Sequence, residues 1–80
     1  MNRKLAEIAG WYGAVAIVLA YALVSFQVVP SNGYVFQLLN LTGAAGIIVI
    51  SATKRVGQSV ALNAFWALIA IIALIKIFLR

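Results

Sequence analysis

The four residues Pro30-Ser31-Asn32-Gly33 (PSNG) decide the fold, because they divide an apolar segment that would otherwise be continuous. From Ile8 to Thr53 the chain carries no charged residue. Proline disfavours helix in the residue before it, and Ser-Asn-Gly supplies turn formers. A helical membrane span needs about 20 apolar residues, so this segment has room for one span on each side of the turn. We therefore predict helices over 9–29 and 34–53.

A second break follows at Lys54-Arg55-Val56-Gly57-Gln58, after which the chain is again uncharged up to Ile75. Two cations suit the last turn of a helix, and Gly57 is the expected C-cap. A third helix is predicted over 59–78. Because both connections are short, sequential helices should be antiparallel neighbours. The prediction is an all-α integral membrane protein, an up-down-up bundle forming one domain over residues 1–80.

The composition supports a membrane protein and excludes several function classes. Of the 80 residues 66% are hydrophobic and 9% are charged, too few charges to coat a soluble domain. The chain has no cysteine, no histidine and one acidic residue, Glu7, so we expect no catalytic site, no metal site and no cofactor. Glu7 is expected to pair with the nearby Arg3 and Lys4.

The net charge of +5 comes from basic residues flanking the predicted spans. This distribution is typical of topology signals and lipid head-group contacts, and it argues against nucleic-acid binding. Four cations (Arg3, Lys4, Lys54, Arg55) lie on the side of the N-terminus, against Lys76 and Arg80 on the other. The N-terminus is therefore predicted to be cytoplasmic. An alternative is that Ala20-Tyr21-Ala22 ends a cleaved signal peptide, although the apolar run continues beyond it.

Polar and small side chains form one stripe on each predicted helix, and such side chains usually face another helix or a water-filled cavity. The stripes comprise Gly10, Ala14, Ile17, Tyr21 and Ser25; Gln37, Asn40, Ala44 and Ser51; and Ser59, Asn63, Trp66, Ala70 and Ala73. From them we take six candidate residues, called here the polar seam: Tyr21, Ser25, Gln37, Asn40, Asn63 and Trp66.

Two interpretations of the polar seam stay open, helix packing or contact with a solute. Tyr21 and Asn40 are expected at similar depth, which makes Tyr21 the predicted partner of Asn40. The sequon Asn40-Leu41-Thr42 is discounted because it lies inside a span. Small residues at 10 and 14, and at 42 and 46, have the spacing for close helix approach. Trp11, Tyr12 and Tyr34 near span ends are typical of interfacial aromatic residues.

Several short motifs, taken in their order along the chain, resemble those of an uncharacterised family of small three-helix bacterial membrane proteins. The resemblance covers roughly Gly10 to Ile72, and its elements are Gly10-Trp11-x-Gly13, Leu19-x-Tyr21-x-x-x-Ser25, Tyr34-x-x-Gln37-x-x-Asn40-x-x-Gly43, Lys54-Arg55 and Asn63-x-x-Trp66-x-x-Ile69. It implies a multi-pass protein of the bacterial inner membrane with no established activity.

A looser similarity is to the three-helix unit of PQ-loop and semi-SWEET transporters, which pair as homodimers around a path lined by a tryptophan and an asparagine. Asn63 is the residue that matches this asparagine, but the chain lacks the Pro-Gln dipeptide. The sequence thus predicts a structural, assembly or regulatory membrane component. The alternative is a homodimeric half-transporter for a small neutral or amphipathic solute. The expected partners are the lipid bilayer and a second copy or another membrane protein.

Overall fold

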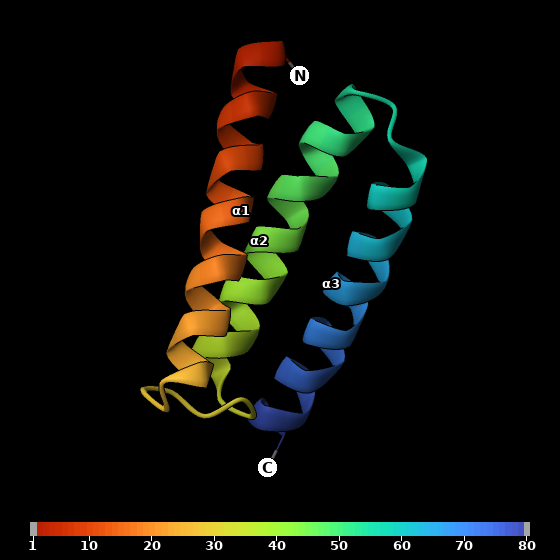
Figure 1. The fold of residues 1–80 in the computed structure, drawn as a ribbon. Helices are drawn as coiled ribbons and strands as arrows, with labels where there is room; N and C mark the ends of the chain where they lie inside the picture. The colour runs from red at the N-terminus through yellow and green to blue at the C-terminus, as the bar shows by residue number, and fades with distance from the viewer. Residues whose placement is uncertain (1, 80) are drawn as a thin grey trace.

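The computed structural model describes residues 2–79, which form three α-helices: α1 (Arg3–Ser25), α2 (Tyr34–Thr53) and α3 (Gly57–Phe78). The helices run antiparallel in sequence order, with the N-terminus and the α2–α3 connection at one end and the α1–α2 connection and C-terminus at the other (Figure 1). All three are long and apolar enough to cross a membrane, and the longest dimension is 38 Å. The predicted three-helix fold is confirmed, and it indicates a membrane protein. Arg80, counted above among the charges, lies outside the described residues.

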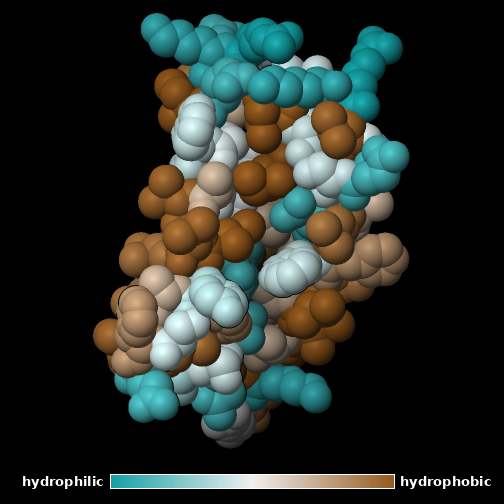
Figure 2. Space-filling view, viewed as in Figure 1, coloured by the Kyte–Doolittle hydropathy of each residue, from teal (hydrophilic) through white to brown (hydrophobic). Residues whose placement is uncertain are grey.

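The helices are arranged as a row, with α2 between α1 and α3 (Figure 1). α1 packs on α2 and α2 packs on α3, but no Cα of α1 lies within 8 Å of a Cα of α3 in the described part of the chain. One side of α2 therefore remains uncovered by its two neighbours. Hydrophilic groups gather at both ends of the molecule, and others lie along the middle of the face shown in Figure 2.

Both boundaries of α1 differ from the sequence prediction. α1 begins at Arg3 rather than at 9, because the Asn2 Oδ1 caps it by accepting hydrogen bonds from the Lys4 N–H (2.7 Å) and the Leu5 N–H (3.2 Å). Its charged first turns thus extend the helix beyond the uncharged run. At the other end α1 stops at Ser25 rather than 29, since Gln27 takes a left-handed conformation (φ 61°) before Pro30 is reached.

α2 also ends at a residue in the left-handed conformation. Arg55 has a φ of 59°, and the Val56 N–H donates to the Ser51 carbonyl at 2.8 Å; after α1 the Val28 N–H donates to the Leu23 carbonyl at 2.9 Å. Both are Schellman-type caps, which satisfy helix carbonyls left without partners. Gly57, predicted as the C-cap of this helix, instead begins α3. Neither cap could be predicted from the sequence, because the left-handed position usually holds glycine and here holds Gln27 or Arg55.

The α1–α2 contact is made almost entirely of small residues. The buried residues of α1 are Ala6, Gly10, Gly13, Ala16 and Ala20, which recur every three or four positions. A Cβ added at Gly13 would collide with the carbonyl oxygen of Gly43, and one at Gly46 with that of Ala9. The two backbones therefore touch directly, as small residues permit in membrane helices. The prediction of close approach is confirmed for Gly10 and Gly46, but their interface companions are Gly13 and Gly43.

The α2–α3 contact is looser. Within the described range, α3 buries only Ala70 and Leu74, whereas α1 and α2 bury five residues each. Most large side chains of α3 are exposed in the isolated chain, and in a bilayer they would meet lipid or another protein. The molecule is thus a tight α1–α2 pair with a more loosely attached third helix.

Candidate functional site

The polar stripes predicted on the second and third helices face each other in the structure. At one end of the α2–α3 contact, the hydroxyl oxygens of Ser51 and Ser59 lie 2.6 Å apart in a hydrogen bond. Further along, Gln37 and Asn40 of α2 line one cleft together with Trp66 and Ala70 of α3. Two of the three stripes therefore meet as the helical periodicity indicated.

This cleft, called here the α2–α3 cleft, has a volume of about 310 Å³ and opens on the surface. It is lined by Phe36, Gln37, Asn40, Trp66, Ile69 and Ala70. Asn40 lies at its inner side with 6% of its surface exposed, and Trp66 is 49% exposed. The lining therefore combines a buried amide, a half-exposed indole and apolar walls, a mixture typical of small-molecule sites and of helix-docking sites.

Asn40 uses only one of its four hydrogen-bonding positions within the described chain. Its Nδ2 donates to the Phe36 carbonyl at 3.0 Å, and no described residue donates to its Oδ1. Every fully buried side-chain nitrogen and oxygen of the described residues has a partner, so this oxygen must be reachable from outside. The cleft thus offers one amide acceptor, the Asn40 Oδ1, to an occupant, beside the half-exposed side chain of Trp66.

The other two amides of the polar seam, Gln37 and Asn63, are engaged locally. The Gln37 Nε2 donates to the Ser31 carbonyl at 3.3 Å, and the Asn63 Nδ2 donates to the Ser59 carbonyl at 2.9 Å. Asn63 is half-buried near the Ser51–Ser59 bond and is not among the residues that line the α2–α3 cleft. Its hydrogen bond to the preceding turn is that of a packing residue.

The two α1 members of the polar seam lie elsewhere. Tyr21 is 73% exposed and Ser25 is also exposed, and Tyr21 makes no hydrogen bond to Asn40. The predicted Tyr21–Asn40 pair is therefore wrong. Its physical reason is that the glycines and alanines of α1 allow the closest approach to α2, so they set the rotation of the helix and turn Tyr21 outward. Depth alone was not sufficient to predict the contact.

One α1–α2 polar contact was not predicted. The Tyr12 hydroxyl and the Thr42 hydroxyl lie 2.7 Å apart in a hydrogen bond, and Thr42 also donates to the Leu38 carbonyl at 2.8 Å. Tyr12 is half-exposed, and its partner Thr42 lies near the middle of α2, so its position at the membrane interface stays a prediction. The signal that would have found this pair is the small-residue periodicity of α1, because Tyr12 flanks the buried Gly13.

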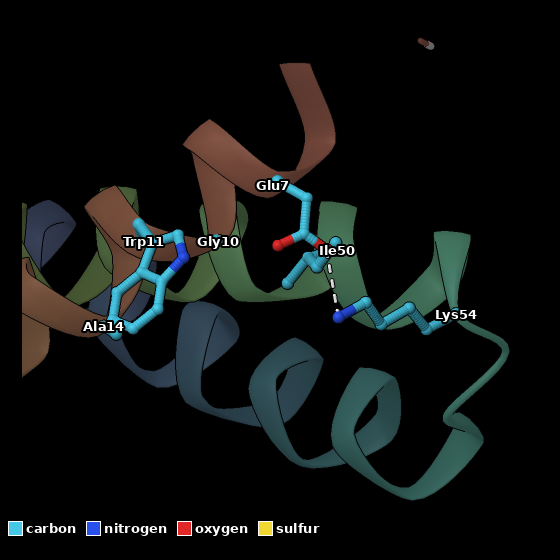
Figure 3. A pocket seen from close by; sticks show the side chains of 6 residues that line it. All are labelled: Glu7, Gly10, Trp11, Ala14, Ile50 and Lys54. Atoms are coloured by element: carbon cyan, nitrogen blue, oxygen red, sulfur yellow. Dashed lines mark ion pairs between the residues drawn. The ribbon is translucent and has the colours of Figure 1, made fainter. Parts of the chain in front are cut away.

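The charged end of the molecule also differs from the prediction. Glu7 pairs with Lys54 of α2, with the Lys54 Nζ 3.0 Å from the Glu7 Oε1, and not with Arg3 or Lys4. The reason is helical geometry: Glu7 precedes Gly10 by three residues, and Gly10 packs against Ile50, one turn before Lys54. The ion pair closes one end of a second hollow, of about 240 Å³, which is lined by Glu7, Gly10, Trp11, Ala14, Ile50 and Lys54 (Figure 3). No cluster of acidic, histidine or cysteine side chains that could hold a metal occurs in the described residues.

Comparison with known proteins assigns the chain to a family. A protein-family model matches residues 6–80. The chain belongs to this uncharacterised family. The match covers nearly the whole chain and confirms the resemblance drawn from the ordered sequence motifs, whereas the looser similarity to the transporter unit gains no support from it. No curated protein and no solved structure matches the chain.

Proposed function

We propose that the protein is a small structural, assembly or regulatory membrane component, and that it acts by holding a membrane-spanning helix of another protein in the α2–α3 cleft. We propose further that it resides in the bacterial inner membrane with its N-terminus in the cytoplasm. The placement of Arg3, Lys4, Lys54 and Arg55 at one end supports that orientation. No reaction is assigned to the protein, because its single carboxylate is engaged by Lys54.

The observation that carries this proposal is the open amide acceptor of Asn40 in the α2–α3 cleft. The Asn40 Oδ1 accepts no hydrogen bond from the described residues, although Asn40 lies seven residues into an apolar helix. A polar group facing hydrocarbon without a partner is costly, so a polar-bearing occupant is favoured over lipid chains. Transmembrane helices associate through hydrogen bonds of this kind.

A photo-crosslinking amino acid at position 66 tests the proposal in the native membrane. The expected result is an adduct with one identified membrane protein, formed in a fixed ratio to this chain. The Asn40→Leu variant, which keeps the side-chain size but removes the amide, should lower the yield severalfold, by the roughly 0.6 kcal/mol or more typical of such bonds. The same crosslinker at Leu68, 51% exposed and away from the cleft, is the matched control and should react with lipid.

If position 66 reacts only with lipid, or if Asn40→Leu leaves the adduct unchanged, the helix-docking proposal is wrong. An unchanged helical content and elution profile of Asn40→Leu in detergent would show that the variant is still folded.

The same cleft favours a second candidate, the homodimeric half-transporter for a small neutral or amphipathic solute. Three helices in a row do not enclose a path, so this function requires a second copy opposite the open side of α2. It is supported by the open acceptor of Asn40 and by the half-exposed ring of Trp66, which line the same cleft. An adduct between two copies at position 66, together with loss of solute uptake in Asn40→Leu, would favour it over the assembly role.

A further inference from the structure

A second surface feature, independent of the α2–α3 cleft, lies between the first turns of α1 and the last turns of α2. It is the hollow lined by Glu7, Gly10, Trp11, Ala14, Ile50 and Lys54, called here the interfacial groove (Figure 3). Charged groups stand at one end, and the rest of the lining is apolar. At 1.5 Å per residue, Gly10 and Ala14 lie about 4.5 Å and about 10 Å further along α1 than Glu7. The groove therefore runs from the membrane surface toward the hydrocarbon.

The apolar part of the groove has the form of a shallow channel. Its floor is formed by the methyl group of Ala14 and by the side chain of Ile50, which fills the space over Gly10. Trp11 forms one wall and is 71% exposed. Tryptophan at this depth is typical of the boundary between head groups and acyl chains. A channel of this form suits an extended hydrocarbon chain lying along α1.

The charged end presents both signs of charge. The side chains of Glu7 and Lys54 are 39% and 45% exposed, so each has atoms that an external group can reach. Arg3, Lys4 and Arg55 are exposed at the same end of the molecule and make the surroundings positive. This field attracts a phosphate. Glu7, the only acidic residue of the chain, adds a carboxylate that a purely anionic head group would leave unmatched.

We propose that the interfacial groove binds one phospholipid with a primary-amine head group, of the phosphatidylethanolamine class. The phosphate lies against the Lys54 ammonium, the lipid ammonium donates to the Glu7 carboxylate, and one acyl chain lies over Ile50 and Ala14 beside Trp11. The single Glu7–Lys54 bond is thereby replaced by two charge-assisted hydrogen bonds to the lipid. A trimethylated amine has no N–H to donate, and an anionic glycerol head group has no cation for Glu7.

Fluorescence quenching tests this site directly. In a Trp66→Phe background Trp11 is the only tryptophan, since the chain has two. The protein is reconstituted in phosphatidylcholine vesicles that contain a bromine-labelled phosphatidylethanolamine, phosphatidylcholine or phosphatidylglycerol with identical acyl chains. Quenching of Trp11 by bromine then reports which lipid occupies the groove.

The expected result is that phosphatidylethanolamine binds about fivefold more tightly than phosphatidylcholine, the size of one charge-assisted hydrogen bond with a partly exposed partner. Glu7→Gln should abolish this preference, Lys54→Gln should weaken all three lipids, and Ala14→Leu, which fills the channel, should reduce quenching by all of them. Lys76→Gln, at the opposite end of the molecule, is the matched control and should change nothing.

Phosphatidylglycerol binding at least as tightly as phosphatidylethanolamine would overturn the proposal, since that result needs only the net positive field. A preference for phosphatidylethanolamine that survives in Glu7→Gln would overturn it as well. Circular dichroism of each variant separates loss of the lipid from loss of the fold.

Discussion

At the scale of single residues, the packing of α1 on α2 depends on glycines, which have no side chain. Gly13, Gly43 and Gly46 bring the α1 and α2 backbones into direct contact, and a Cβ at Gly43 would lie 2.8 Å from the Ile17 Cγ1. No large side chain among the described residues is fully buried. Dispersion between closely approached backbones therefore replaces the interlocking of large side chains that holds soluble cores together.

Gly13→Ala tests this arrangement. The added methyl group would meet the Gly43 carbonyl and the Ile47 N–H, both of which are backbone and cannot move aside cheaply. We expect the free energy of unfolding to fall by about 1–3 kcal/mol, the usual effect of overpacking. The measurement is loss of helical circular dichroism on titrating the micelle-bound protein with a denaturing detergent.

Gly57→Ala is the matched control. A Cβ at Gly57 would meet no atom within 4 Å, and alanine favours helix over glycine by up to about 1 kcal/mol. This variant should be unchanged or slightly more stable. A Gly13→Ala variant that is as stable as Gly57→Ala would show that close approach of the two backbones does not limit stability at Gly13.

At the scale of the elements, α2 has two differently built faces. One consists mainly of small residues packed closely against α1, while the other carries Asn40 and Ser51 toward α3. Polarity and periodicity in the sequence were sufficient to predict the second face, including Trp66 and Gln37 in one cleft. They failed on α1, because the stripe through Tyr21 was chosen for its polar groups whereas the contact is set by the smallest residues. They also failed at the helix ends, since Gln27 and Arg55 take left-handed conformations that favour glycine.

The Ser51–Ser59 hydrogen bond should couple α2 to α3. In a double-mutant cycle with Ser51→Ala and Ser59→Ala, we expect a coupling free energy of about 0.5–1 kcal/mol, as found for side-chain hydrogen bonds between membrane helices. The same detergent titration measures it. Thr53→Ala is the control, because Thr53 bonds only to the Val49 carbonyl of its own helix. A coupling near zero would mean that the loose α2–α3 contact does not depend on this bond.

At the scale of the whole molecule, the two ends differ in charge and in composition. The N-terminus and the α2–α3 connection share one end, which carries Arg3, Lys4, Lys54 and Arg55, and the α1–α2 connection lies at the other (Figure 1). This separation could be predicted from the positions of the turns and the cations. The absence of contact between α1 and α3 could not, because it depends on the angle at which each helix crosses α2.

Single cysteines give the topology, since the natural chain contains none. In intact cells, Asn32→Cys should react with a membrane-impermeant maleimide, whereas Asn2→Cys and Gln58→Cys should react only after the membrane is opened. All three positions are exposed in the structure. Labelling of positions 32 and 58 from the same side would contradict a spanning α2. Labelling of positions 2 and 58 alone in intact cells would reverse the proposed orientation.

The row of helices also bears on how the protein is made. Because each helix contacts only its neighbour in the sequence, the order of contacts along the row is the order in which a ribosome delivers the segments. Once residue 53 has left the ribosome, α1 and α2 can form every contact of their glycine interface. α3 then packs against a helix pair that is already formed. Local contacts of this kind form quickly and need no long-range closure. The helix that arrives last is also the one held by the fewest buried residues.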